Sequence, residues 1–123
     1  MNILVVDDSR AIHAFITGLF ATTAHALKHV FDGQQAVLCV GDRNNSFDVI
    51  LLDWEMPVLS GIDALKEIRA LGIACPIIMV TTKNEPESIA LALERGATDF
   101  VMKPFTKDIL FGKLSDICGM EVA

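Results

Sequence analysis

Short runs of consecutive apolar residues recur along the chain, and segments with helical spacing separate them. Four runs contain only apolar side chains, many of them β-branched, as is typical of strands buried on both faces. A fifth segment, at 26–30, is more mixed in composition. The pattern therefore predicts five strands, at 3–6, 26–30, 49–52, 77–80 and 100–102.

The segments between these strands place apolar residues three and four positions apart, the spacing of one helical face. In the first segment this face consists of Ile12, Phe15, Ile16, Leu19 and Phe20, and in the third of Ile62, Leu65, Ile68 and Leu71. Residues typical of helix starts precede or open each segment: Ser9, Asp32 with Gln35 three positions on, Ser60, Pro86 and Thr106. The last segment has an apolar face of Ile109, Leu110, Leu114 and Ile117, which makes five predicted helices.

Five alternating strand–helix pairs with continuous apolar strands are typical of an α/β fold. We expect a three-layer, doubly wound arrangement, with a five-stranded parallel sheet covered by helices on both faces. The 123 residues fit one domain, residues 1–123, and 52% hydrophobic residues against 21% charged ones are enough to build its core. No repeat, linker or low-complexity segment interrupts the pattern.

Composition excludes several classes of protein. Ten basic and sixteen acidic residues give a net charge of −6, which disfavours direct binding of nucleic acid. No apolar stretch approaches the ~20 residues of a membrane-spanning helix, and the first apolar run is shorter than the ~7–15 residues of a signal-peptide core. The three cysteines, Cys39, Cys75 and Cys118, are scattered, which predicts reduced thiols in a cytoplasmic protein.

Polar residues follow four of the predicted strands, at the edge of a parallel sheet where ligands bind. They are Asp7 and Asp8, Asp53, Thr81 and Thr82, and Lys103 and Pro104. Three carboxylates that converge repel one another, so they share protons or hold a cation. Oxygen ligands favour a hard ion such as Mg²⁺, and a nearby lysine and hydroxyl suit the oxygens of a phosphoryl group.

These residues, with the segments 53–57 and 96–100, resemble a two-component response-regulator receiver domain. The similarity is greatest to single-domain regulators of the bacterial chemotaxis type, and it covers essentially the whole chain. It implies a flavodoxin-like fold and a phosphorylation-dependent signalling switch. A histidine kinase or a histidine phosphotransfer protein would then supply the phosphoryl group.

The resemblance also implies a role for each site residue. Asp53 would be the phosphoacceptor. Asp8, Asp53 and the backbone carbonyl of Glu55 would hold Mg²⁺ (or Mn²⁺), and Asp7 would act mainly through a bound water. The remaining roles concern the switch: Thr81 moves toward the phosphoryl group, Lys103 pairs with one of its oxygens, Pro104 follows a cis peptide bond, and Phe100 turns inward.

Two further expectations concern the rim of the site and the output. Glu55 and Lys83 stand two positions beyond Asp53 and Thr81, and we predict that they pair and shield the acyl phosphate; two independent solvated charges are the alternative. We expect no output domain after the last helix. By resemblance, a downstream protein would then contact the fourth helix, fifth strand and fifth helix. Phe100 has no hydroxyl to offer such a partner.

Three rival functions compete with the signalling switch. An aspartyl-phosphate hydrolase of the haloacid-dehalogenase type needs a second acid two residues after its nucleophile, where this chain has Ser9. A flavodoxin-like electron carrier would have to bind phosphate beside two aspartates, which repel it without a metal. An inert receiver-like scaffold would lack part of the acid–threonine–lysine set.

The three histidines receive plainer interpretations. His25 and His29 are four residues apart, which on a helix is a spacing for Zn²⁺ ligands. The segment reads better as a strand, where the two side chains share a face but lie far apart. His13 is expected on the solvated surface of the first helix.

Overall fold

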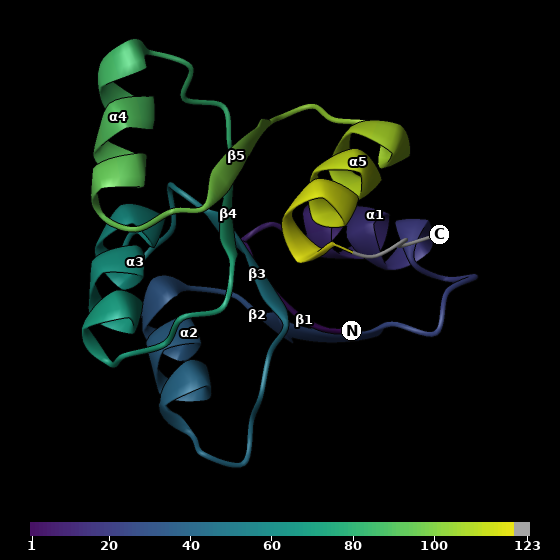
Figure 1. The fold of residues 1–123 in the computed structure, drawn as a ribbon, viewed down its shortest axis with the longest axis horizontal. Helices are drawn as coiled ribbons and strands as arrows, with labels where there is room; N and C mark the ends of the chain where they lie inside the picture. Colours follow the sequence, from purple (N-terminus) through teal and green to yellow (C-terminus); the bar gives the residue numbers. More distant parts are fainter. Residues whose placement is uncertain (120–123) are drawn as a thin grey trace.

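The computed structural model describes residues 1–119 and contains one sheet of five parallel strands, in the order β2-β1-β3-β4-β5 (Figure 1). The strands are β1 (Asn2–Val6), β2 (Ala26–Val30), β3 (Val49–Asp53), β4 (Ile77–Thr81) and β5 (Asp99–Met102). Four of them continue one residue beyond the predicted apolar run, or begin one residue before it, because the ladder includes polar residues: Asp53 pairs with Val80, and Asp99 with Ile78. The predicted doubly wound, flavodoxin-like α/β fold is confirmed.

Five helices connect and follow the strands. They are α1 (Arg10–Leu19), α2 (Gly33–Gly41), α3 (Gly61–Ala70), α4 (Pro86–Glu94) and α5 (Lys107–Cys118). The predicted caps are in place. Side-chain oxygens of Ser9, Asp32, Ser60 and Thr106 each accept a backbone N–H three residues on, at 2.8–3.3 Å. Pro86 occupies the first turn of α4, where its missing N–H costs no hydrogen bond.

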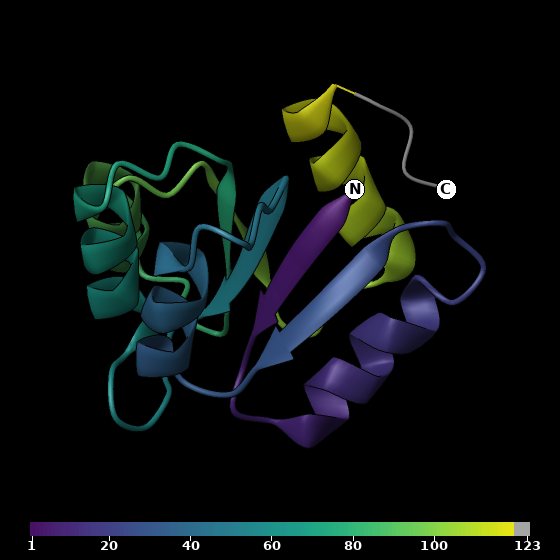
Figure 2. The same cartoon turned by 90° about the horizontal axis from the view of Figure 1, so that it is seen from below.

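The helices cover both faces of the sheet, α1 and α5 on one side and α2, α3 and α4 on the other (Figure 2). Alternate residues of β1 serve the two layers: Ile3 and Val5 pack toward α1 and α5, and Leu4 and Val6 toward the other three helices. Because neither face of the central strands meets solvent, both sets of side chains are apolar.

The order of the strands determines where a site can form. The second strand, β2, lies beside β1 at one edge of the sheet, and the chain then crosses back so that β3 lies on the other side of β1. The connections after β1 and β3 therefore leave on opposite faces of the sheet. In sheets of this kind, ligands bind at the carboxyl ends of two strands whose connections diverge in this way.

Several expectations about individual residues are wrong. His13 is buried, with 6% of its surface exposed, because it packs against Phe31 and contacts the Asp7 carbonyl after β1 and the His29 ring of β2. Two members of the predicted apolar faces are exposed, Phe15 by 43% and Ile109 by 50%, because they lie at the edges of their helical stripes. Leu71, the last member of the α3 stripe, lies past the helix end and is 52% exposed.

Three other expectations concern histidines, membranes and the chain end. His29 lies in β2, whereas His25 precedes that strand and contacts the amino terminus of Met1, so the two have different surroundings. Among residues 1–119, no helix is both long and apolar enough to cross a bilayer. The expected absence of an output domain after α5 bears on residues 120–123, which lie outside the described part.

Candidate functional site

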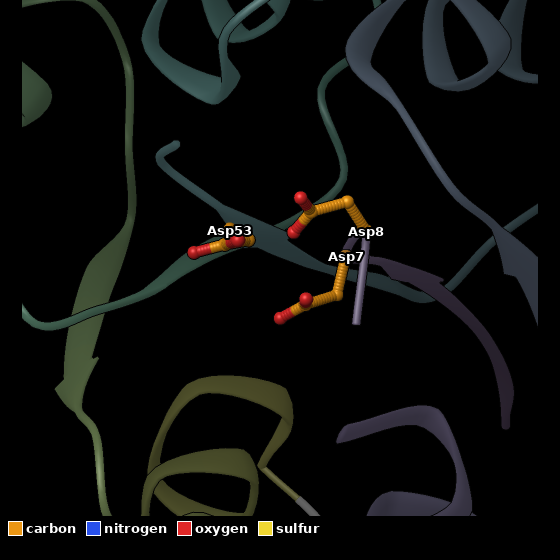
Figure 3. A group of neighbouring side chains, drawn as sticks. All are labelled: Asp7, Asp8 and Asp53. Atoms are coloured by element: carbon orange, nitrogen blue, oxygen red, sulfur yellow. The ribbon is translucent and has the colours of Figure 1, made fainter. Parts of the chain in front are cut away.

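Three carboxylates gather at the carboxyl ends of β1 and β3 (Figure 3). Asp7 and Asp8 follow β1, and Asp53 is the last residue of β3, whose neighbour Leu52 pairs with Val6. One oxygen from each carboxylate lies within 4.8 Å of the other two. Asp7 and Asp53 are buried, with 2% and 8% of their surfaces exposed, and Asp8 is exposed to solvent.

Each polar atom of Asp7 has a hydrogen-bond partner. Its N–H donates to the Val30 carbonyl at 3.3 Å, and its own carbonyl lies 2.7 Å from Nε2 of His13. Of its carboxylate oxygens, Oδ1 accepts the Ser9 N–H at 2.8 Å and Oδ2 accepts from Lys103 Nζ at 2.7 Å. Asp7 is therefore a rigid component of the site.

Asp53 is held less completely. Its Oδ1 accepts the N–H of Trp54 at 2.9 Å and faces Lys103 Nζ at 3.2 Å. Burial, and after it the charge of Asp7, raise the pKa of Asp53 to about 6, while Lys103 and the Trp54 hydrogen bond oppose the shift. The positive charge around the Asp53 carboxylate is therefore too small to offset burial and the charge of Asp7.

Lys103 reaches the site from the end of β5. Burial acts to lower the pKa of its ammonium group, but the hydrogen bond to Asp7 and the charges of Asp53 and Asp7 outweigh burial and raise that pKa. Lys103 therefore stays protonated near neutral pH. The peptide bond between Lys103 and Pro104 is cis.

The charges of the site do not balance with protein groups alone. Three carboxylates face one ammonium group, Lys103, which leaves an excess of negative charge. Within residues 1–119, Asp8 makes no hydrogen bond or ion pair that would compensate it. An oxygen-only donor set with excess negative charge fits a hard divalent cation such as Mg²⁺.

Thr81 ends β4 at the same edge of the sheet and is 4% exposed. Its Oγ1 accepts the N–H of Lys83 at 3.0 Å, so the hydroxyl proton remains for another acceptor. The N–H of Lys103 donates to the Thr81 carbonyl at 2.9 Å. The ammonium group of Lys103 contacts Asp7 and Asp53, and Thr81 is joined to Lys103 through the backbone at the same edge of the sheet.

Two charged residues form the rim. Glu55 Oε1 lies 3.2 Å from Lys83 Nζ, and the two side chains are 75% and 30% exposed. Lys83 Nζ also lies 5.6 Å from the centre of the Trp54 ring, a cation–π distance. The three side chains form one cluster beside Asp53.

Phe100 stands on β5, opposite Met79 of β4. Its half-buried ring packs against the core layer beneath α2, α3 and α4. On its other side Lys113 Nζ lies 5.9 Å from the ring centre, and this lysine also pairs with Asp99 at 3.0 Å. The ring therefore lies between the apolar core layer and the Lys113 side chain.

The first residue of α3, Gly61, is a positioning residue that the sequence-based reasoning missed. The N–H of Gly61 donates to the Trp54 carbonyl at 2.6 Å, and a Cβ at position 61 would overlap the carbonyl oxygen of Asp53. A glycine directly after the helix cap Ser60 was the available signal. His13 was missed too, and its contact with Asp7 has no local signal in the sequence.

Comparisons with known proteins agree with this geometry. The family model for the response regulator receiver domain matches residues 3–115. The chain is 32% identical to the chemotaxis protein CheY homologue of Campylobacter jejuni, with 97% of this chain and 93% of that protein covered. It is also 32% identical to the transcriptional regulatory protein DltR of Streptococcus agalactiae. That match covers 93% of this chain but only 50% of the relative.

A solved structure supports the same assignment. The receiver domain of the sensor histidine kinase PA1611 from Pseudomonas aeruginosa superimposes with a TM-score of 0.85 at 31% identity, over 97% of this chain and 98% of that one. That protein was crystallised with a magnesium ion in its active-site cleft. The haloacid-dehalogenase alternative finds no support in the comparisons. The chain belongs to the response regulator receiver domain family and is a receiver of two-component signalling.

Proposed function

We propose that Asp53 accepts a phosphoryl group from a histidine kinase or a histidine phosphotransfer protein, in the cytoplasm, and that residues 1–123 act together as one receiver. The observation that carries the proposal is the position of the Asp53 carboxylate, which lies 3.2 Å from Lys103 Nζ and within 4.8 Å of an oxygen of Asp7 and of Asp8. Three unpaired cysteines accord with a reducing compartment.

The acidic cluster would hold Mg²⁺ (or Mn²⁺) through Asp8, Asp53 and the backbone carbonyl of Glu55, with Asp7 acting through a bound water. The excess negative charge and the oxygen donors support this assignment, as does the magnesium ion in the PA1611 receiver. When bound, the cation neutralises part of the charge between the Asp53 carboxylate and the incoming phosphoryl group.

In the transfer step, a carboxylate oxygen of Asp53 forms a bond to phosphorus. The bond between phosphorus and the donor histidine nitrogen breaks, and its electron pair stays on that nitrogen. A carboxylate is a weak nucleophile toward an anionic phosphoryl group, so catalysis depends on position and on neutralised charge. The Lys103 ammonium group pairs with one phosphoryl oxygen, and the Thr81 hydroxyl donates a hydrogen bond to another.

The acyl phosphate would then bias the switch. Phosphorylation gives Asp53 more negative charge and three acceptor oxygens, which attract Thr81 and Lys103. Movement of Thr81 lets the Phe100 ring turn inward, which alters the surface of α4, β5 and α5, where the downstream protein binds. A differential of about 2–3 kcal/mol between the two arrangements would change the active population roughly 30- to 150-fold.

Acetyl phosphate with Mg²⁺ tests the proposal without the natural donor. We expect the intact mass to rise by one phosphoryl group and the fluorescence of Trp54, the sole tryptophan, to change because it adjoins the acceptor. Asp53→Asn should lose the mass gain and the phosphoryl-dependent signal. Lys103→Ala should still bind Mg²⁺ but respond weakly to the phosphoryl group; a wild-type response from this variant would contradict the role of Lys103.

A further inference from the structure

A pair of histidines connects the surface of the protein to the acidic cluster. His13 on α1 is buried, and its Nε2 lies 2.7 Å from the carbonyl oxygen of Asp7. Its other ring nitrogen, Nδ1, lies 2.6 Å from Nδ1 of His29 on β2. His29 Nε2 in turn lies 3.3 Å from Oγ1 of Thr17 on the exposed side of α1.

The partners determine where the protons lie along this row. A carbonyl oxygen can only accept, so Nε2 of His13 carries a proton and donates it to Asp7. In neutral His13, Nδ1 then carries no proton and accepts a hydrogen bond from the protonated Nδ1 of His29. Nε2 of neutral His29 is left to accept from the Thr17 hydroxyl. Every ring nitrogen is satisfied, and the two histidines adopt opposite tautomers.

The contact with Asp7 also orients the residue that follows it. The Asp7 carbonyl oxygen and the Asp8 nitrogen belong to one planar peptide group. A hydrogen bond to that oxygen therefore restrains the orientation of the peptide group between Asp7 and Asp8, and with it the direction of the Asp8 side chain. Asp8 makes no hydrogen bond or ion pair within residues 1–119, so its place in the cluster depends on this peptide plane.

We propose that His13 is a positioning residue for the cation site, and that His29 holds His13 in the orientation that this requires. The inference rests on the proposed function, because it assumes that the acidic cluster binds a divalent cation. Groups that orient metal ligands commonly change metal affinity by 10–100-fold when removed, so we expect loss of the His13 hydrogen bond to weaken Mg²⁺ binding about tenfold.

Matched substitutions separate the hydrogen bonds from the packing. His13→Leu keeps an apolar side chain but removes both ring contacts, whereas His13→Gln keeps an N–H donor for the Asp7 carbonyl. His29→Leu removes the donor to His13, whereas His29→Asn keeps an N–H near the Nδ1 position. For each variant we would measure the Mg²⁺ dissociation constant from Trp54 fluorescence, and the free energy of unfolding without Mg²⁺.

The proposal predicts weaker Mg²⁺ binding in both leucine variants and near-normal binding in His13→Gln and His29→Asn. Lower stability with an unchanged Mg²⁺ dissociation constant in the leucine variants would overturn it, because His13 would then serve only the core. A wild-type chain that does not bind Mg²⁺ would overturn the proposed function together with this inference. Normal wild-type binding with unchanged variants would overturn the inference alone.

Nitrogen NMR of the wild-type chain provides a second test that needs no variant to fold. In slightly alkaline solution, we expect a proton on Nε2 of His13 and on Nδ1 of His29, with a coupling between the two Nδ1 atoms across their hydrogen bond. The same tautomer in both histidines, with no such coupling, would exclude the proposed row of hydrogen bonds.

Discussion

At the scale of single residues, the site places a buried carboxylate where the surrounding charges disfavour its ionised form. Asp53 loses hydration on burial and faces the charge of Asp7, and Lys103 and the Trp54 N–H oppose these effects. The ionised form that must attack phosphorus is therefore costly in the absence of a cation. The energy released when that charge is neutralised is available to bind metal and phosphoryl group.

The raised pKa of Asp53 predicts how stability depends on pH without divalent cations. The pKa rises from 3.8 to about 6 on folding, so ionisation opposes folding: the cost is absent below pH 3.8 and complete above about 6. We expect Asp53→Asn to be more stable than wild type at pH 7.5, by on the order of 2–3 kcal/mol, and the difference to disappear near pH 4. Urea unfolding in a chelator at several pH values measures it; a constant difference would contradict the account.

Glu55 and Lys83 form an ion pair at the rim of the site. We propose that it shields the acyl phosphate on Asp53 from water. An exposed pair contributes only a fraction of a kcal/mol, so Glu55→Ala and Lys83→Ala should each speed dephosphorylation by about two- to fivefold. The double variant should be no faster than the faster single variant, since both remove one interaction. Unchanged hydrolysis rates would show that the two charges act independently of the acyl phosphate.

At the scale of elements, local chemistry was enough to predict the strands and the helix starts. Both faces of β3 and β4 are buried, so their apolar runs are continuous, and caps such as Ser9 act within three residues. Exposure at the edges of helices was less predictable. Spacing identifies an apolar face but does not show how much of it is covered, and so the exposure of Phe15 and Ile109 could not be predicted.

The turn from β3 into α3 offers a test at this scale. Gly61→Ala would force a Cβ against the Asp53 carbonyl, and we expect it to destabilise the fold by about 2–3 kcal/mol and to impair phosphorylation by moving Asp53. Gly18→Ala is the matched control: that glycine lies in α1 with nothing within 4 Å of its added Cβ. It should stabilise the protein by about 0.5–1 kcal/mol.

Chemical denaturation of both variants, with phosphorylation by acetyl phosphate measured alongside, distinguishes the two effects. If Gly61→Ala proved as stable and as reactive as Gly18→Ala, the close approach of position 61 to the Asp53 backbone would not matter for the site.

At the scale of the whole molecule, the topology brings distant residues together, and this is why part of the site could be predicted. Lys103 contacts Asp7 across 96 positions of sequence because parallel strands end at one edge of the sheet. The contact between His13 and His29 follows no such rule. It depends on how α1 packs over β2, and on side-chain rotamers that the pattern of apolar residues does not reveal.

The same topology links metal binding to global stability, because the acidic cluster joins segments after β1 and β3 that separate on unfolding. We expect Mg²⁺ at ten times its dissociation constant to raise the free energy of unfolding by about 1.4 kcal/mol. Asp8→Asn should lose most of this increment, while Asp116→Asn, an exposed acid on α5, should retain it. An equal increment in all three proteins would indicate that Mg²⁺ acts elsewhere.

Chemical trapping of the phosphorylated residue tests the central claim most directly. The chain would be incubated with acetyl phosphate and Mg²⁺ and then reduced with borohydride, which converts an aspartyl phosphate to homoserine, and its peptides would be analysed by mass spectrometry. The account predicts homoserine at position 53 and no other modified residue. Modification of Asp7, Asp8 or a histidine, with Asp53 intact, would contradict it.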